Sequence, residues 1–111
     1  MSVNFELKIF MDLSLEEWKK KIESDKNAFL LDVRTAEEFE EGHIPQATLL
    51  DIRQASNFID GIQSLDVSKN YYVYCRSGLR SAQACQLMNH YGFKTTYNLL
   101  GGFMEWDRES S

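Results

Sequence analysis

Strand and helix patterns alternate five times along the 111-residue chain, and this alternation limits its possible folds more than any other feature. Capping boxes at residues 14–17 and 35–38 mark two helix starts. Repeated strand–helix units build a parallel sheet with helices on both faces. We therefore predict one α/β domain over residues 1–111 with a five-stranded parallel sheet. The expected strands are 6–11, 29–33, 47–50, 71–74 and 95–99, and the expected helices are 14–23, 35–42, 54–64, 79–91 and 103–107.

The composition is that of a protein with an ordinary hydrophobic core. Hydrophobic residues make up 43% of the chain, so the core needs no disulfide or metal for support. The two cysteines lie only ten positions apart, which argues against a disulfide framework and fits a reducing compartment. Residues 1–25 lack the pattern of a signal peptide, and no stretch approaches the ~20 apolar residues of a membrane span. We expect a cytoplasmic protein with no membrane partner.

Charge is distributed unevenly along the chain. The net charge of −5 argues against nucleic-acid binding. Residues 1–66 hold 14 of the 17 acidic residues, whereas residues 67–104 contain none. The acid-free segment carries Lys69, Arg76, Arg80 and Lys94. This segment is therefore expected to attract small anions.

One cysteine, Cys75, lies where such a fold places reactive groups. The strand pattern at 71–74 ends immediately before it, and the helical pattern begins at Leu79. The carboxyl ends of parallel strands form the sites of these sheets. Free cysteine titrates near about 8.5, and helix N-termini and nearby cations lower that value to roughly 3.5–7.5. The pattern predicts a thiolate nucleophile that acts on an anionic substrate.

Four motifs occur in a fixed order along the chain. They are Leu-Leu-Asp-Val-Arg at 30–34 followed by Glu-Phe at 38–39, Gly-His-Ile-Pro at 42–45 with Ala47, Cys-Arg-Ser-Gly-Leu-Arg-Ser at 75–81, and Leu-Gly-Gly at 100–102 with Trp106. In order and spacing they resemble the single-domain rhodaneses, a family of sulfurtransferases, over nearly the whole sequence. The resemblance implies one rhodanese-like domain. At position 46, where that family usually has glycine, this chain has Gln46.

The resemblance also implies a reaction. Cys75 would take a sulfane sulfur from a small anionic donor such as thiosulfate, hold it as a persulfide, and pass it to a thiophilic acceptor. A protein donor or acceptor is equally compatible with the sequence, and the physiological donor stays open between thiosulfate, a cysteine desulfurase persulfide, polysulfide and a thiol carrier. No zinc-ligand spacing, glycine-rich phosphate loop or dinucleotide fingerprint occurs, so we expect no cofactor.

The residues after Cys75 are expected to form its active-site loop. Arg80 would brace loop carbonyls or bind the oxyanion of the donor, and Arg76 either binds substrate or is simply exposed. Ser77 and Ser81 would donate hydrogen bonds to the sulfur anion or cap the helix, and Gly78 would permit a loop conformation that side chains resist. The predicted loop comprises Arg76, Ser77, Gly78, Leu79, Arg80 and Ser81.

Two alternatives of a different class share the same motif. The spacing Cys-x4-Arg from Cys75 to Arg80 is one residue shorter than the Cys-x5-Arg of related cell-cycle phosphatases. A smaller ring suits a sulfur atom better than a phosphate, which disfavours a small phosphatase or arsenate reductase. The other alternative is a sulfur-relay or binding module that serves a partner protein.

The remaining candidate residues have simpler structural interpretations. Arg34 is expected to pair with Glu37 or Glu38 and fix the strand-to-helix turn. His43 is expected to hold a turn rather than act as a base. Cys85 falls on the apolar stripe of the helix after the loop, and we interpret it as a core residue rather than a resolving cysteine.

Overall fold

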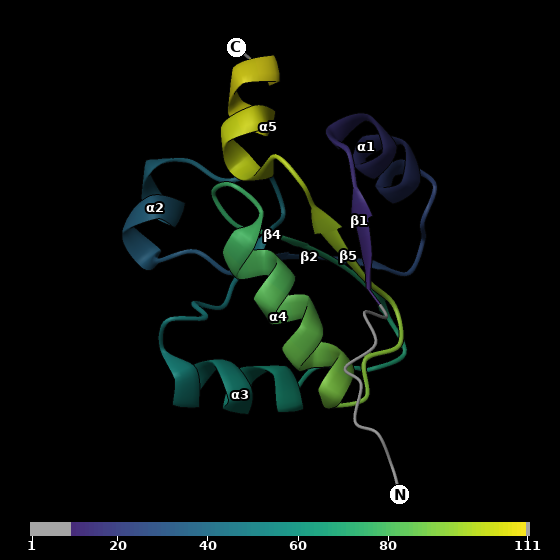
Figure 1. The fold of residues 1–111 in the computed structure, drawn as a ribbon, viewed down its shortest axis with the longest axis vertical. Coiled ribbons are helices and arrows are strands. Elements are labelled where there is room, and N and C mark those ends of the chain that lie inside the picture. Colours follow the sequence, from purple (N-terminus) through teal and green to yellow (C-terminus); the bar gives the residue numbers. More distant parts are fainter. Residues whose placement is uncertain (1–9, 111) are drawn as a thin grey trace, which may run out of the picture.

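The computed structural model describes residues 10–110, which form one five-stranded sheet with every strand parallel (Figure 1). The strand order is β1-β5-β4-β2-β3, which puts β4 at the centre. The strands are β1 (Met11–Leu13), β2 (Ala28–Asp32), β3 (Thr48–Leu49), β4 (Asn70–Tyr74) and β5 (Thr96–Leu99). The helices are α1 (Leu15–Glu23), α2 (Ala36–Glu41), α3 (Ala55–Gln63), α4 (Leu79–His90) and α5 (Gly102–Ser110). The predicted fold class is confirmed.

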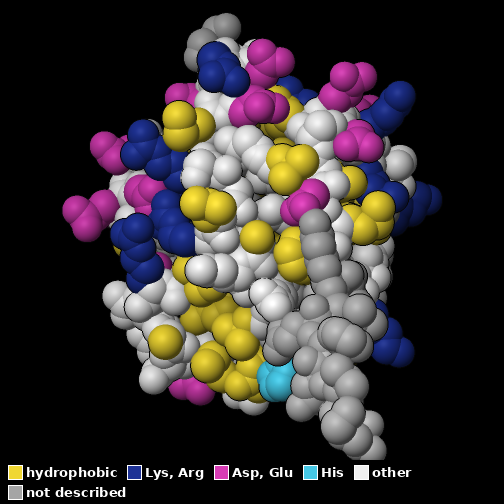
Figure 2. Space-filling model, in the orientation of Figure 1, with side chains coloured by type: hydrophobic (Ala, Val, Ile, Leu, Met, Phe, Trp, Pro, Cys, Tyr) yellow, Lys and Arg dark blue, Asp and Glu magenta, His cyan; other side chains and the backbone are white. Residues whose placement is uncertain are grey.

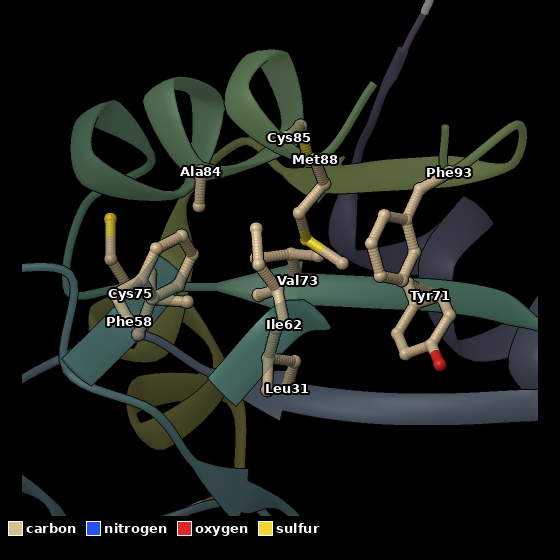
Figure 3. Close-up of a cluster of buried hydrophobic side chains, with 11 residues drawn as sticks. Leu31, Phe58, Ile62, Tyr71, Val73, Cys75, Ala84, Cys85, Met88 and Phe93 are labelled. Atoms are coloured by element: carbon tan, nitrogen blue, oxygen red, sulfur yellow. The ribbon is translucent and has the colours of Figure 1, made fainter. Parts of the chain in front are cut away.

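Side chains of the central strand alternate between two hydrophobic clusters. Tyr71 and Val73 point into a cluster with α3 and α4, which Figure 3 shows in close-up. Tyr72 and Tyr74 point to the other face, where they meet Trp18 of α1 edge-on. Because both faces of β4 are buried, its sequence is apolar or aromatic at every position after Asn70. Helices therefore cover both faces of the sheet, as predicted.

Both predicted capping boxes are present. The Ser14 hydroxyl accepts from the Glu17 backbone N–H at 3.2 Å, and the Glu17 carboxylate accepts in return from the Ser14 N–H at 3.1 Å. Thr35 and Glu38 make the same reciprocal pair at 3.2 Å and 3.0 Å. Each box satisfies N–H groups that a helix start would otherwise leave unpaired.

The two ends of the fold differ from the prediction. The first strand was expected at 6–11; residues 6–9 lie outside the described part, and β1 begins at Met11. Its partner is β5, with Asp12 directly opposite Asn98. The last helix begins at Gly102 and continues to Ser110, beyond the expected turn at 103–107. The longer helix packs Phe103 and Trp106 against the α1 face of the sheet.

Gln46 adopts the backbone conformation that glycine would provide. Its φ is +73°, and among the described residues it is the only non-glycine residue with a positive φ. The neighbouring turn is closed by the Ala47 N–H, which donates to the Ile44 carbonyl at 3.1 Å. A left-handed conformation costs a side-chain-bearing residue about 1–2 kcal/mol. The turn geometry is thus kept at a cost in local strain.

Candidate active site

Cys75 is the first residue after the central strand β4, between β2 and β5. The backbone there is fixed by the Val33 N–H, which donates to the Tyr74 carbonyl at 3.0 Å. Only 1% of Cys75 is exposed, so the thiol lies at the base of the loop rather than on the surface. The chain then turns through residues 76–78 into α4. This places the sulfur at the carboxyl edge of the sheet, as the sequence predicts.

The sulfur of Cys75 is surrounded by hydrogen-bond donors. The Gly78 N–H donates to Sγ at 3.1 Å, and the Ser81 hydroxyl lies 3.3 Å from Sγ. Burial works to raise the pKa of this thiol. The Ser81 hydroxyl and the N–H groups of Ser81, Gly78 and Ser77 outweigh burial, so the pKa of Cys75 is lowered from its ordinary value. The geometry favours a thiolate, which is the nucleophilic form of cysteine.

Gly78 gives the loop its shape. It is the N-cap of α4 with a φ of +105°, a region that L side chains resist. That conformation turns its N–H toward the Cys75 sulfur. Its carbonyl accepts from the Asn98 amide at 3.2 Å. The expected role of Gly78 in permitting the loop is thus visible in its backbone.

The start of α5 supports the loop from the other side. The Phe103 N–H donates to the Cys75 carbonyl at 2.8 Å, and the Met104 N–H donates to the Arg76 carbonyl at 3.1 Å. Gly102 lies so close that a Cβ there would be 2.3 Å from the Arg76 carbonyl oxygen. The bracing of loop carbonyls expected of Arg80 is therefore done by backbone groups of α5.

Arg80 instead forms a two-point ion pair with Glu38 of α2. Its Nη1 and Nη2 lie 2.8 Å and 3.0 Å from the two carboxylate oxygens. Hydrogen bonding to Arg80 is the largest influence on Glu38 and, with the Thr35 contacts, lowers its pKa from 4.5 to about 2. The pair joins the first turn of α4 to α2 and keeps the Arg80 guanidinium beside the loop.

Arg34 pairs with Asp32, not with Glu37 or Glu38 as expected. Its Nη2 lies 2.7 Å from the Asp32 carboxylate, and both side chains are almost completely buried. The same nitrogen donates to the Gly42 carbonyl at 2.8 Å, and the guanidinium stacks 4.4 Å from the centre of the Phe103 ring. The expectation was wrong because the fold pairs Glu38 with Arg80, and Arg34 turns back to Asp32, two positions before it.

These ion pairs change the charge at the mouth of the site. Two of the three nearby arginines are neutralised, and Arg76, which is exposed, makes no ion pair with any acidic residue between 10 and 110. In Figure 2, basic side chains at the left edge of the face are interleaved with acidic ones, while hydrophobic side chains gather toward the middle. Leu79, the first residue of α4 after the loop, is 76% exposed. The acid-free segment is therefore less cationic in the fold than in the sequence.

Sequence reasoning missed Asn98 of β5 and Asp12 of β1. Asn98 is 2% exposed, and its amide nitrogen donates to the Asp12 carboxylate at 2.9 Å. Its carbonyl oxygen accepts from the Ser81 hydroxyl at 2.5 Å. The available signal was an asparagine within a strand pattern that is otherwise suited to burial, since a buried amide needs partners.

The second cysteine has no place in this site. Cys85 is fully buried, and burial raises its pKa to about 12. Figure 3 shows it beyond Ala84, farther along α4 than the loop. The core role predicted for Cys85 is confirmed.

Within residues 10–110 no cluster of histidine, cysteine and acidic side chains could hold a metal ion, and no helix is long and apolar enough to cross a bilayer.

His43 holds a turn, as expected. Its ring stacks on Phe39 with centroids 3.7 Å apart, and Nδ1 lies 2.9 Å from the Phe39 carbonyl oxygen. The side chain closes the carboxyl end of α2, where the Gly42 N–H donates to that same carbonyl at 3.2 Å. These contacts describe a structural histidine.

Glu38→Gln is expected to lower the free energy of unfolding by about 2 kcal/mol at pH 7, allowing for partial exposure of the pair. The Glu38 pKa is lowered from 4.5 to about 2 in the fold. Its contribution is therefore complete above pH 4.5 and is lost as the pH falls toward 2. Urea unfolding of both proteins at pH 7 and pH 2.5 measures the difference. An equal difference in unfolding free energy between the two proteins at both pH values would contradict this account. The control variant is Glu40→Gln, on the exposed side of α2.

Known proteins are similar to this chain in sequence and in fold. The rhodanese-like domain family matches residues 14–109. The Bacillus subtilis (strain 168) protein YtwF is 39% identical over 99 residues, which cover 89% of this chain and 92% of that protein. The thiosulfate sulfurtransferase GlpE of Coxiella burnetii (strain RSA 493) is 32% identical over 92 residues, covering 83% and 81%.

Solved structures agree with the sequence comparison. A Staphylococcus aureus rhodanese-like domain protein superimposes with a TM-score of 0.75 at 30% identity, covering 86% of this chain and 90% of that one. The human single-domain sulfurtransferase TSTD1 superimposes with a TM-score of 0.73 at 26% identity, covering 90% and 97%. With a cysteine loop of this geometry, this fold and these relatives, the chain belongs to the rhodanese-like domain family of sulfurtransferases.

Proposed function

We propose that this protein transfers a sulfane sulfur through a persulfide on Cys75. The observation that carries the proposal is the donor ring at the sulfur, with the Gly78 N–H at 3.1 Å, the Ser81 hydroxyl at 3.3 Å and a lowered Cys75 pKa. Such a ring stabilises the anion on the Cys75 sulfur that attacks the donor. The sulfurtransferase relatives support the same reaction class.

The proposed cycle has two displacement steps. The Cys75 thiolate attacks the outer sulfur of thiosulfate, a new S–S bond forms, and the S–S bond of thiosulfate breaks. Sulfite leaves with the bonding electron pair, and Cys75 becomes a persulfide anion. A nucleophile such as cyanide then attacks the terminal sulfur, thiocyanate leaves, and the thiolate is regenerated. A covalent intermediate of this kind gives ping-pong kinetics.

The loop geometry favours this reaction over phosphate chemistry. Phosphoryl transfer relies on cations clamped on the phosphate oxygens, yet Arg80 is held by Glu38 at 2.8 Å and 3.0 Å. Arg76 is exposed at the rim and is the arginine available to a small anionic donor. The short ring therefore fits a single sulfur atom with modest cationic assistance.

A protein donor or acceptor is the second candidate, and the exposed apolar residues of the rim favour it. Leu79 is 76% exposed, and Leu100 and Met104 are each 48% exposed. The Leu100 backbone packs against Gly78, and the Met104 N–H bonds the Arg76 carbonyl, so these residues lie beside the loop. Exposed apolar side chains that surround a reactive thiol suit contact with another protein surface.

Mass spectrometry after brief exposure to thiosulfate tests the proposal. We expect one added sulfur on the peptide that contains Cys75 and its loss when cyanide is added. Cys85→Ala should give the same adduct, because that thiol is buried away from the loop. An adduct on Cys85 alone would contradict the proposal. So would hydrolysis of a phenyl phosphate in a protein that forms no adduct with thiosulfate, polysulfide or a desulfurase persulfide.

A further inference from the structure

The hydroxyl of Ser81 lies between two acceptors but has only one proton to donate. Its Oγ is 2.5 Å from the Asn98 carbonyl oxygen and 3.3 Å from the Cys75 sulfur. Ser81 is fully buried and Asn98 is 2% exposed, so both side chains lie away from bulk solvent. Only one of the two contacts can use the Ser81 proton at any time.

The orientation of the Asn98 amide is fixed by its other partners. Its nitrogen donates to the Asp12 carboxylate at 2.9 Å and to the Gly78 carbonyl at 3.2 Å, and both groups can only accept. Asp12 lies opposite Asn98 in the β1–β5 register, so the sheet itself sets this pairing. The amide oxygen must therefore face Ser81, and two oxygens at 2.5 Å repel unless the hydroxyl proton lies between them.

We infer that Asn98 is a positioning residue that competes with the Cys75 sulfur for the Ser81 proton. With a neutral thiol, the S–H group donates to Ser81 and the hydroxyl donates to Asn98. A thiolate needs the hydroxyl proton itself, and taking it leaves the Asn98 oxygen unpaired. The hydrogen bonds that run from Asp12 through Asn98 to Ser81 thus weaken the hydrogen bond that Ser81 can donate to the thiolate before sulfur is loaded.

Loading with sulfur removes the competition, a point that rests on the proposed function. In a persulfide the charge lies on the terminal sulfur, and the Cys75 Sγ is a neutral bridging atom. The Ser81 hydroxyl is then free to return to Asn98, and the buried Asn98 oxygen is paired again. Asn98 therefore favours the loaded form over the empty thiolate. A less stabilised thiolate is also the stronger nucleophile.

Other charged or titratable groups lie near the loop, and all of them except Asp12 must be held constant in any test of this inference. None of them bonds the Ser81 hydroxyl. They are Asp32 and Arg34 at the end of β2, Arg76 in the loop, Arg80 and Cys85 on α4, Glu38 on α2, Asp12 on β1, Asp51 after β3, and Glu105 and Asp107 on α5.

The pH dependence of Cys75 alkylation by iodoacetamide, followed by mass spectrometry of its peptide, tests the inference. Asn98→Leu removes the competing acceptor, so the midpoint should move to lower pH by about half a unit to one unit, or threefold to tenfold in thiolate. Ser81→Ala should move it to higher pH. In the Ser81→Ala background, Asn98→Leu should have no further effect. A shift that persists without Ser81, or a shift to higher pH, overturns the inference.

A charge-neutral swap covers the case in which Asn98→Leu does not fold. Asp12→Asn combined with Asn98→Asp keeps an amide–carboxylate pair between β1 and β5 but presents a carboxylate to Ser81. The swap should move the alkylation midpoint to higher pH. The shift should be larger in a protein that has Ser81 than in the Ser81→Ala background. Equal shifts with and without Ser81 would show a purely coulombic effect and would overturn the inference.

The alkylation assay reports thiol acidity whether or not sulfur is transferred. A wild-type protein that forms no persulfide with any donor would refute the proposed function, while the alkylation profiles would still decide the role of Asn98. If both hold, Asn98→Leu should also reduce the persulfide fraction at a fixed ratio of thiosulfate to sulfite. An unchanged or increased fraction would overturn the link between Asn98 and the loaded form.

Discussion

Cys75→Ser is expected to reduce sulfur transfer to less than about one-thousandth of the wild-type rate, since a hydroxyl supplies neither the anion nor the S–S bond. The fold should survive. The serine oxygen can accept the Gly78 N–H that now donates to sulfur at 3.1 Å. We therefore expect a change in unfolding free energy below about 2 kcal/mol. Thiosulfate–cyanide turnover and urea unfolding measure the two effects.

The matched control for this variant is the other cysteine. Cys85→Ala removes a fully buried thiol from the core and should destabilise the protein by about 1–2 kcal/mol through the cavity it leaves. Its turnover should stay within about twofold of wild type, because no step of the proposed cycle uses that thiol. Turnover of more than a few per cent in Cys75→Ser, or loss of turnover in folded Cys85→Ala, would show that the nucleophile has been misassigned.

Gly102→Ala is expected to damage both stability and activity. Gly102 has a φ of +61°, and a Cβ there would lie 2.3 Å from the Arg76 carbonyl oxygen. That contact is with backbone, so either the loop or the start of α5 must move. Strain and overpacking together should cost about 3–4 kcal/mol. Displacement of the loop by even about 1 Å should slow sulfur transfer by roughly a hundredfold.

Gly92→Ala is the control that separates the strain of a positive φ from the steric clash of an added Cβ. Gly92 also has a positive φ, +94°, but nothing lies within 4 Å of the position of an added Cβ. We expect it to lose about 1–2 kcal/mol of stability and to keep full activity. Urea unfolding and turnover, measured on both variants, provide the comparison. Equal stability losses, or normal transfer in Gly102→Ala, would show that the loop does not depend on close contact with α5.

The local features of this protein could be predicted from its sequence. The two capping boxes, the strand that delivers Cys75 and the glycine in its loop each depend on residues a few positions apart. The central helices and strands followed from periodicity, which reports on burial of one or both faces. The first strand and the length of the last helix were less accurate, because their boundaries depend on what they pack against.

The contacts that tune the site could not be predicted from neighbouring residues. Arg80 and Glu38 are 42 positions apart, and only the fold brings them together. Arg34 is an exception, because its partner Asp32 lies only two positions away but precedes it, whereas the expected partners follow it. Asn98 looked like an ordinary strand residue, and its role depends on the register between β1 and β5.

The pairing of β1 with β5 also bears on where this domain can be divided or joined to other proteins. The family match begins at residue 14, two residues after Asp12, although β1 spans Met11–Leu13. A domain trimmed to that boundary would lose the strand that covers β5, and β5 would become an open edge prone to pairing with other chains. It would also lose the carboxylate that orients the Asn98 amide. Fusions and transplanted copies of this module should therefore keep β1 as part of the catalytic unit.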